Sequence, residues 1–583
     1  MASTYDKLPA VKIPAKHSSI WKSYDAIFQE LERRLTQSSS PHPVLTIDTY
    51  PGVHDDEILG ALRVHFPGAE IVQTLDSKLA EDALLPRIER NLTDDRIFGV
   101  LSCHQLEEFF DREKLSHARS RAKSFSGKLL IVYGVGAALV HPGDVYVFAD
   151  MARWEIQLRF RKGMPNWGAD NGREDVFRKY KRSFFIEWRA ADRHKFKHMG
   201  QVDYFLDSHE AGNPKMITGP AGRAGFAEAA RQPFRVVPLF DPAPWGGQWM
   251  GEKFDLPRDK PNYGWCFDCV PEENSLLLEI GGETVEFPSL NVVYRHPVQL
   301  LGDKVHARFG CEFPIRFDFL DTMDGGHLSF QVHPLTEYIQ QHFGMHYTQD
   351  ESYYMLDAGD DACVYLGVKT GVDPDAMVND LVTAQTDAAK PFPAEKHVNV
   401  WAAKKHDHFL IPAGTVHCSG KNSMVLEISA TPYIFTFKMW DWGRLGLDGR
   451  PRPVHLQHGV PNIQWDRDTE WTKKNLINQF EQIAEGEGWR EERTGLHERE
   501  FIETRRHWFT GAVPHDTNGG VNVLNLVEGD EAVVESPDGL FAPFIVHYAE
   551  TFIVPASVGK YTVRPHGPAE GKQCATMKAF VRT

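Results

Sequence analysis

Residues 327–333, His-Leu-Ser-Phe-Gln-Val-His, alternate strictly between polar and apolar side chains. Successive side chains of a β-strand point to opposite faces, so this stretch would carry one polar row and one apolar row. The polar row consists of His327, Ser329, Gln331 and His333. Such a strand is typical of a barrel or jelly roll whose interior is wet or holds a metal. The stretch therefore predicts a barrel strand that carries a functional site.

Two further segments supply side chains of the same chemical kind. Glu351 opens the strand-like run Glu-Ser-Tyr-Tyr-Met-Leu, and His417 follows a turn that begins at Pro412. Gln, His and Glu side chains are N and O donors, and a zinc site with an exchangeable position would use them. We therefore expect Gln331, His333, Glu351 and His417 to hold Zn²⁺, and another divalent first-row metal stays open.

The charge balance argues against two classes of partner. The 583-residue chain has 80 Asp and Glu against 64 Lys and Arg, a net charge of −16. Nucleic acids and anionic membranes both need a basic surface, so neither is expected as a partner. The N-terminus has no apolar segment of signal-peptide length, and the seven scattered cysteines do not suggest a disulfide framework. We expect a cytoplasmic protein of several domains, and a homo-oligomer stays open.

From about residue 40 to residue 210, short β-rich apolar runs alternate with helical stretches. This alternation is typical of a parallel sheet with helices on both faces. Residues 1–232 are therefore expected to form a doubly wound α/β domain. The runs at 43–50 and 98–103 are among its expected strands. The basic, aromatic-rich stretch 178–195 is expected to be a solvated surface whose apolar face packs.

The loop at 48–54, after the first of these strands, is where such a sheet would bind a ligand. It contains one glycine and no lysine, whereas a phosphate-binding P-loop needs G-x-x-x-x-G-K-[ST]. By general shape the region resembles uridine-kinase-like P-loop domains, which implies a degenerate kinase-like domain. A binding or packing domain without chemistry is favoured over phosphoryl transfer, which needs a clamp on the phosphates.

After a boundary near 219–232 the pattern changes to short strands separated by Pro and Gly turns. Several such strands at close spacing are typical of a jelly roll. We expect a metal-binding all-β domain over 233–465, a helical connector over 466–502 and a second jelly roll over 503–583.

Several motifs follow one another in this second part of the chain. They are WGG at 245–247, FP at 313–314, LSFQVHP at 328–334, ESYYMLD at 351–357 and IPAGTVH at 411–417. In this order they resemble the type I mannose-6-phosphate isomerases, which are zinc enzymes of the cupin superfamily. The resemblance covers about residues 233–583 and implies a double cupin. It also implies the metal ligands Gln331, His333, Glu351 and His417, which alternation and donor chemistry had selected independently.

The chemistry that this resemblance implies is aldose–ketose interconversion, which moves a proton between C1 and C2 through an enediol. A base must reach the carbon-bound proton, and a metal can polarise the carbonyl. The candidate bases are Glu427, Asp318 and His327. Glu427 shares a period-two strand face with Ser429 and Thr431, which suggests a polar pocket lining. A structural ion pair of Glu427 is the alternative.

Two positions differ from the family pattern. Members have a lysine in the strand before the Q-x-H strand, where this chain has Asp318, with Arg316 on the same face. Members have an arginine where this chain has Lys438. Lysine keeps the positive charge but lacks the guanidinium group that can bind two oxygens at once. Since an acidic residue repels a phosphate dianion, we expect a sugar or sugar phosphate rather than mannose 6-phosphate in particular. The expected substrate contacts are Arg316, Asp318, Ser329 and Lys438, and the expected catalytic residues are Lys438, Glu427 and His327.

Two functions from different classes follow from these observations. The first is a zinc-dependent aldose–ketose isomerase of a sugar or sugar phosphate. The second is a non-catalytic metal-cupin that binds a carbohydrate or sugar phosphate and acts as a sensor. A further metal-cupin reaction, such as an oxidation with iron, stays open because the ligand set suits other first-row metals.

Overall fold

The protein is described here by a computed structural model that covers residues 3–14, 16–387, 389–450, 452–495, 497 and 500–583. It divides into two compact units. The α/β unit comprises Ala10–Ala229 and Ser275–His296. The sandwich unit comprises Met1–Pro9, Ala230–Asn274 and Pro297–Thr583.

The α/β unit contains a seven-stranded mixed sheet. Its strands, in spatial order, are β2 (Ile20–Lys22), β8 (Lys215–Thr218), β7 (Tyr204–Asp207), β6 (Val145–Asp150), β3 (Val44–Thr49), β5 (Leu130–Gly134) and β4 (Glu70–Gln73). The five strands from β7 to β4 are parallel, and β8 and β2 add an antiparallel edge. The expected parallel core is therefore present, within a mixed sheet.

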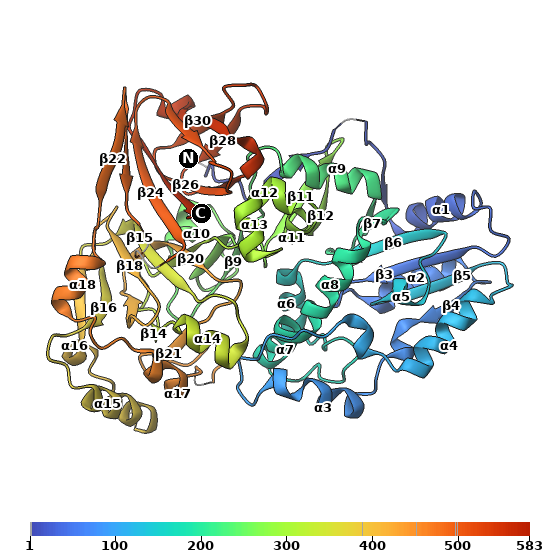
Figure 1. Cartoon of the computed structure of the whole chain (residues 1–583), viewed down its shortest axis with the longest axis horizontal. Coiled ribbons are helices and arrows are strands. Elements are labelled where there is room, and N and C mark those ends of the chain that lie inside the picture. The colour runs from blue at the N-terminus through green and yellow to red at the C-terminus, as the bar shows by residue number, and fades with distance from the viewer. Residues whose placement is uncertain (1–2, 15, 388, 451, 496, 498–499) are drawn as a thin grey trace. The chain divides into compact units, whose positions relative to one another are not determined.

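Helices lie on both sides of this sheet (Figure 1). Strands β3, β5 and β6 are buried along their whole length, which explains why the sequences of β5 and β6 are nearly continuous apolar runs. The helices are α1 (Tyr24–Leu35), α2 (Asp55–His65), α3 (Glu81–Leu92), α4 (Arg112–Lys123), α5 (Ala137–Val140), α6 (Arg153–Arg161), α7 (Val176–Arg182), α8 (Trp188–His198) and α9 (Gly219–Ala229), with the short turns η1 (Thr74–Ser77), η2 (Leu106–Phe109) and η3 (Ser183–Glu187).

Two expectations for this unit are wrong. Residues 98–103 form no strand, because their backbone bonds to helical segments instead: the Val100 N–H donates to Asn91 O and the Ser102 N–H donates to Phe185 O. The basic stretch 178–195 is buried rather than solvated. It belongs to α7, the π-helical turn η3 and α8, and Lys179 donates its ammonium hydrogens to three backbone carbonyls.

The second piece of the α/β unit, residues 275–296, comes from far along the chain. It forms the hairpin of β11 (Ser275–Ile280) and β12 (Glu283–Pro288), then α11 (Leu290–Arg295). Strand β1 (Ala10–Lys12) pairs with β11 to complete a three-stranded sheet. The sequence boundary expected near residue 232 does not anticipate this second piece.

The first sandwich of the sandwich unit has two antiparallel sheets. The six-stranded sheet contains, in order, β18 (His408–Ile411), β15 (Asp350–Ala358), β20 (Ser423–Ala430), β13 (Arg316–Asp321), β10 (Trp265–Cys269) and β9 (Leu239–Asp241). The five-stranded sheet contains β17 (Val398–Ala402), β16 (Cys363–Val368), β19 (His417–Ser419), β14 (Phe330–Val332) and β21 (Phe437–Trp440).

Short helices fill the connections of this unit. They are α10 (Trp249–Lys253), α12 (Pro297–Leu301), α13 (Asp303–Phe309), α14 (Thr336–Phe343), α15 (Pro374–Thr386), α16 (Ala394–His397), α17 (Leu456–Gly459) and α18 (Thr469–Asn475), with the 3₁₀ turns η4 (Val460–Asn462), η5 (Ala556–Val558) and η6 (Gly567–Ala569). No helix in the described part of the chain is long and apolar enough to cross a membrane.

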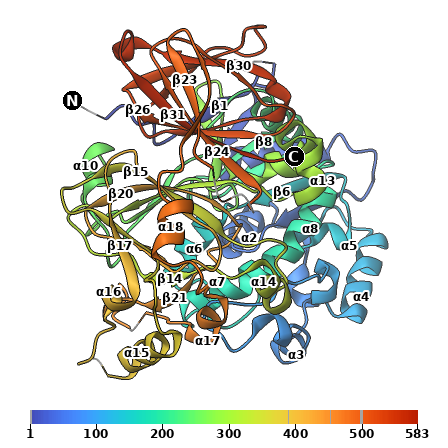
Figure 2. The same ribbon diagram turned by 60° about the vertical axis from the view of Figure 1, so that its left-hand side comes forward.

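The C-terminal sandwich also has two antiparallel sheets, whose strands are visible in Figure 2. Six strands form one sheet: β22 (Glu481–Gly486), β23 (Trp489–Arg493), β24 (Ile502–Phe509), β31 (Cys574–Val581), β26 (Asn522–Glu528) and β29 (Thr551–Val554). Four form the other: β25 (Val513–Asp516), β30 (Lys560–Pro565), β27 (Glu531–Glu535) and β28 (Phe544–His547). A buried apolar cluster that includes Phe509, Leu526 and Phe552 lies between them.

The expected helical connector over 466–502 is only partly helical. Helix α18 ends at Asn475, and β22 and β23 then form a hairpin that pairs with β24. The polar sequence of this hairpin suits an edge with many exposed side chains, and it shows no clear alternation of polar and apolar residues. The second sandwich therefore begins with β22 rather than near residue 503.

Candidate metal centre

The expected ligands come from three strands of the first sandwich. Gln331 lies in β14 and pairs in register with His417 at the start of β19. His333 follows β14 by one residue, and Glu351 lies near the start of β15 on the facing sheet. The turn before His417 contains Gly414, whose φ of 84° favours glycine. The sandwich thus brings the four residues, distant in sequence, to one place.

The ligand atoms of three of these residues converge. Glu351 Oε1 lies 3.1 Å from His333 Nε2 and 2.9 Å from His417 Nε2. Ligand atoms of His333, Glu351 and His417 all lie within 4.8 Å of one another, and all three residues are buried. The amide nitrogen of Gln331 is placed 3.1 Å from His417 Nε2. An amide flip would direct its oxygen to the same point.

Each histidine is oriented by its second ring nitrogen. His333 Nδ1 lies 2.9 Å from Phe435 O, and His417 Nδ1 lies 2.9 Å from Thr415 O. A carbonyl oxygen only accepts, so each Nδ1 carries the hydrogen and each Nε2 keeps its lone pair for a cation. Within the described chain, His333 Nε2 and Glu351 Oε1 make no hydrogen bond of good geometry, although they lie 3.1 Å apart. These orphaned atoms and the N/O donor set fit a divalent cation.

The electrostatics of the three groups agree with this arrangement. Burial alone would raise the pKa of Glu351, but the imidazoles of His333 and His417 bring it well below its usual value. Burial alone would lower the pKa of His333, but the Glu351 carboxylate raises it. Burial lowers the pKa of His417. A negative carboxylate between two imidazoles is a typical setting for a bound cation.

Two rows of side chains cross the six-stranded sheet beside these ligands. Directly opposed residues of neighbouring antiparallel strands share a face. Glu351 is opposed by Ser429, which is opposed by Arg316. The next row consists of Tyr353, Glu427 and Asp318. Since Glu351 faces the histidines, both rows face the interior.

The interior charges next to the ligands are strongly coupled. Arg316 Nη2 lies 3.7 Å from Asp318 Oδ1, and both residues are almost fully buried. Burial raises the pKa of Asp318 to about 7, against the lowering effect of Arg316. Burial, then Asp318 and Glu351, hold the pKa of Glu427 well above its usual value. A carboxyl with a raised pKa near a metal is suited to proton transfer.

The remaining expected site residues fall in two groups. Ser329 is buried in the polar row, and Lys438 in β21 pairs in register with Gln331 and is partly exposed. His327 lies apart. The strand begins only at Phe330, and the ring of His327 packs 4.5 Å from Trp442 while Nδ1 accepts the Lys421 N–H. The structure therefore does not bring His327 to the metal ligands.

Sequence reasoning missed Gln349. Its amide nitrogen donates to Glu351 Oε2 at 3.0 Å, lies 3.5 Å from Glu427 Oε1, and its oxygen accepts the Phe435 N–H. It thus links the candidate metal ligand Glu351, the raised-pKa carboxyl of Glu427 and the backbone that orients His333. Its position two residues before Glu351, on the same face by period two, was the available signal.

The nucleotide-kinase resemblance of the α/β unit is not borne out. Helix α2 follows the expected ligand loop, and its first turn carries Asp55, Asp56 and Glu57, which would repel a phosphate at the helix N-terminus. The carbonyl of Gly52 accepts a hydrogen bond from Arg159, so the loop is held against α6.

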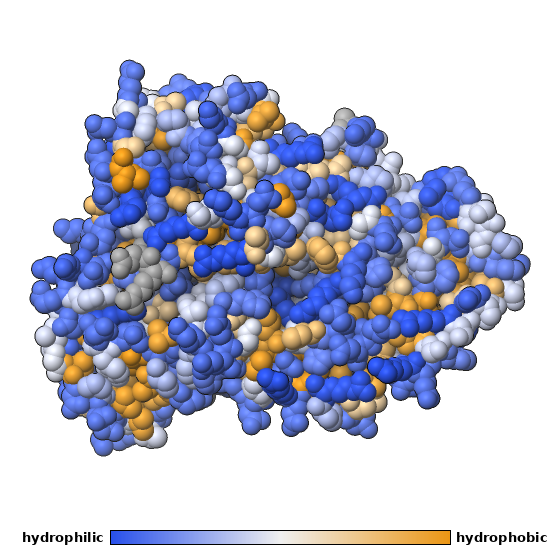
Figure 3. All heavy atoms as spheres, viewed as in Figure 1, coloured by the Kyte–Doolittle hydropathy of each residue, from blue (hydrophilic) through white to orange (hydrophobic). Residues whose placement is uncertain are grey.

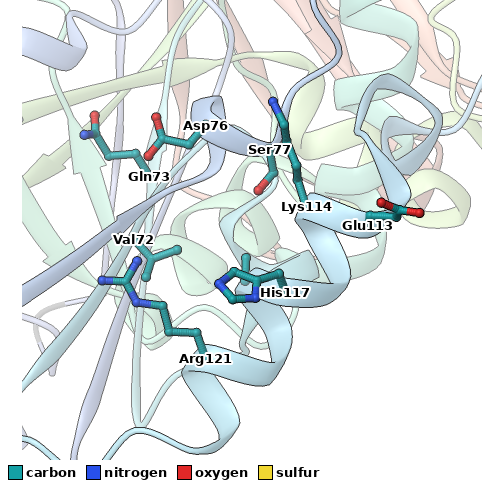
Figure 4. A pocket seen from close by; sticks show the side chains of 9 residues that line it. Val72, Gln73, Asp76, Ser77, Glu113, Lys114, His117 and Arg121 are labelled. Atoms are coloured by element: carbon teal, nitrogen blue, oxygen red, sulfur yellow. The ribbon is translucent and has the colours of Figure 1, made fainter.

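A pocket of about 370 Å³ lies elsewhere in the α/β unit, between β4, η1 and α4 (Figure 4). Lys114, His117 and Arg121 reach it from successive turns of α4, together with Asp76 and Glu113. None of the residues assigned a role from sequence lines it. On the face shown in Figure 3, hydrophilic residues predominate and apolar ones form scattered patches.

Comparison with known proteins supports the sequence motifs. Over 234 residues the chain is 26% identical to the mannose-6-phosphate isomerase ManA of Bacillus subtilis, covering 40% of this chain and 68% of that protein. Part of this chain is similar to mannose-6-phosphate isomerases. A mannose-6-phosphate isomerase of Streptococcus mutans is 26% identical over 218 residues, 37% of this chain and 63% of that protein. Residues 23–231 match a family model described as a domain of unknown function, DUF8485.

Solved structures of the same name also match. The crystal structure of the mannose 6-phosphate isomerase from Bacillus subtilis aligns with 60% of this chain and 99% of its own, at 18% identity and a TM-score of 0.47. A putative mannosephosphate isomerase from Archaeoglobus fulgidus aligns with 60% of this chain and 98% of its own, at 16% identity and a TM-score of 0.44.

Proposed function

We propose that this chain is a zinc-dependent aldose–ketose isomerase of a sugar or sugar phosphate, built on a double cupin. The observation that carries the proposal is the convergence of His333, Glu351 and His417 beside the buried carboxyl of Glu427. The sequence similarity to mannose-6-phosphate isomerases points in the same direction. Zn²⁺ held by these three residues and Gln331 would polarise the substrate carbonyl.

The roles of the chain's own residues follow from their chemistry. Glu427 takes the proton from C2 of the aldose and returns it to C1, while the O2 proton passes to O1, so an enediol links aldose and ketose. A raised pKa makes the Glu427 carboxylate a stronger base than an ordinary glutamate, which suits a group that must both accept and return a proton. Lys438 supplies positive charge toward the oxygen that becomes negative, and Gln349 is a positioning residue for Glu351 and Glu427.

The test is an isomerase assay on the full, zinc-loaded chain with a panel of free and phosphorylated aldoses. We expect ketose formation, and we expect Glu427→Gln to lower kcat by about 10²–10⁴-fold with zinc content unchanged. If zinc-loaded protein leaves the whole panel unconverted, the isomerase proposal fails. Tight sugar binding without turnover would then support the sensor function.

A further inference from the structure

The row of Asp318, Glu427 and Tyr353 lies two residues along its strands from the row that contains Glu351. Two residues of an extended strand span about 6.6 Å, roughly the length of a few carbon atoms of a sugar. A substrate whose reacting carbons lie between the metal centre and Glu427 would therefore place its next carbons toward Asp318, which lies beside Glu427 in the second row. This inference rests on the proposed isomerase function.

Asp318 is fully buried, yet neither of its carboxylate oxygens accepts a hydrogen bond from any described residue. Its nearest cation, Arg316, approaches Oδ1 to 3.7 Å, beyond hydrogen-bond distance. Further interior atoms near Asp318 share this condition, among them Arg316 Nε, Ser429 Oγ and Tyr353 Oη. Buried polar groups are nearly always hydrogen-bonded, so this set of unsatisfied atoms indicates that a ligand supplies the partners.

The chemistry of these atoms selects the ligand. Carboxylate oxygens need donors, the guanidinium Nε needs an acceptor, and hydroxyls of serine and tyrosine accept either role. A sugar hydroxyl both donates and accepts, so a run of hydroxyls satisfies all of them. A phosphate dianion offers only acceptors, so its oxygens could not donate a hydrogen bond to the Asp318 carboxylate and would be repelled by it.

The net charge of the interior also favours an uncharged ligand over a phosphorylated one. The inward faces of β13, β15 and β20, all of whose residues the structure describes, carry three carboxylates and one guanidinium. A divalent cation would balance that surplus, leaving a neutral chamber. A phosphate dianion would bring two more negative charges into a buried site, where like charges repel far more strongly than in water. Lys438, on the facing sheet, is a single cation at a partly exposed position.

We propose that the site takes an uncharged aldose or ketose, and that Asp318 determines this preference by accepting hydrogen bonds from the sugar hydroxyls beyond C2. Asp318 acts in binding rather than in proton transfer. Its removal therefore raises KM for a free sugar more than it lowers kcat.

The experiment compares free D-mannose, D-fructose and other aldoses with their 6-phosphates on the full, zinc-loaded chain. We expect kcat/KM to favour free sugars by at least 10-fold in the natural protein. Asp318→Asn should lower kcat/KM for free sugars about 10-fold through KM, with less effect on the phosphates. Asp318→Lys should move the preference toward the phosphates. Zinc content and thermal unfolding show whether each variant is folded.

Calorimetric binding separates this proposal from the proposed function, because it needs no turnover. The probes are mannitol and mannitol 6-phosphate. Tighter binding of mannitol, weakened in Asp318→Asn, supports the preference even if no sugar is isomerised. If the natural protein prefers the phosphorylated ligands in both assays, the proposed preference for uncharged sugars is wrong. If it binds free sugars more tightly but isomerises none, only the proposed isomerase function is wrong. Should Asp318→Lys not fold, Asp318→Asn carries the test, and unchanged KM and affinity there also overturn the proposal.

Discussion

At the scale of single residues, the proposed metal site depends on ring nitrogens whose direction the backbone already fixes. The Nδ1 hydrogens of His333 and His417 are taken by carbonyl oxygens, so neither ring needs to turn to present Nε2 to a cation. Preorganisation of this kind reduces the entropy lost on binding. The affinity for the metal should therefore depend on these two rings much more than on other histidines of the sandwich.

Replacing His333 by Ala should weaken zinc binding at least about 100-fold, since changes to outer-shell partners alone cost roughly 10–100-fold. Bound zinc per chain, measured after dialysis against a weak chelator, checks this. The matched control is His327→Ala, which removes a histidine of the same polar row that packs on Trp442 and should leave the zinc content unchanged. Equal loss in both variants would contradict the assigned ligand set.

The sequence was informative for residues whose side-chain direction follows from period two. Gln331, His333, Glu351 and His417 could be selected because strand alternation and donor chemistry agreed. His327 was selected by continuing that alternation beyond the start of the strand at Phe330. Gln349 acts through contacts with Glu351, Glu427 and Phe435. The polar–apolar alternation within one strand does not reveal contacts between strands, so this pattern alone does not single the residue out.

At the scale of elements, the loop between β3 and α2 depends on one glycine. Gly52 has a φ of 109°, and an added Cβ would lie 2.7 Å from the Ile156 side chain of α6. Gly52→Ala should therefore lower the free energy of unfolding by roughly 1–3 kcal/mol through backbone strain and crowding. Urea denaturation monitored by circular dichroism measures this change.

A matched control lies in the next helix. An added Cβ at Gly60, inside α2, would meet nothing within 4 Å. Gly60→Ala should raise the free energy of unfolding by about 0.5–1 kcal/mol, because alanine restricts the unfolded chain and favours helix. Destabilisation by both substitutions to the same extent would argue against the close approach of the loop to α6.

Elements were easiest to predict where burial was complete. The apolar runs of β5 and β6 are easy to recognise because both strands are buried along their whole length, which leaves little place for polar residues. Strands β22 and β23 were mistaken for helix, because exposed side chains on a hairpin edge leave only a weak alternation. The apolar run at 98–103 is only partly buried and forms no strand, a tertiary effect that local propensity does not encode.

At the scale of the whole molecule, acid stability should reflect buried histidines. The ring centroids of His507 in β24 and His515 lie 4.5 Å apart. His507 Nε2 also lies 3.3 Å from a carboxylate oxygen of Glu491. Lys578 and Arg505 are close to the same carboxylate. Burial lowers the pKa of His507 to about 4, although Glu491 opposes this. The buried ring therefore stays neutral while the unfolded chain takes up a proton.

Because the folded pKa is below the unfolded value of about 6.5, His507 stabilises the fold fully above pH 6.5 and loses that contribution as pH falls toward 4. The loss is about 1.4 kcal/mol per pH unit. Unfolding free energies of the natural protein and of His507→Gln, measured from pH 7 to 4.5, should differ in slope by about that amount. Parallel curves would contradict a neutral, buried His507.

The piece at 275–296 should be a structural part of the α/β unit. Phe287 of β12 is fully buried, and its ring lies 5.7 Å from Phe205 of β7 and 6.0 Å from Phe226 of α9. Asn291 donates to Asp150 at 2.7 Å. No pattern in the sequence indicates that a hairpin so far along the chain packs on this sheet, so the expected boundary near 232 left it out.

Phe287→Ala should destabilise the α/β unit by about 3–5 kcal/mol, as for other buried aromatic truncations. Hydrogen exchange should accelerate in β7 and α9. The control Val64→Ala, at a side chain that is 83% exposed, should change stability by less than about 0.5 kcal/mol. Unchanged exchange in β7 and α9 of Phe287→Ala would show that the hairpin does not support the sheet.

The chain passes between its two units four times, after residues 9, 229, 274 and 296. A gene that encodes such a path cannot exchange one unit for a foreign counterpart through a single recombination breakpoint. Any breakpoint between residues 10 and 296 would divide the α/β unit, either within residues 10–229 or between them and the hairpin at 275–296. The two units should therefore be inherited together, and a protease that cuts once would release neither of them free of residues of the other.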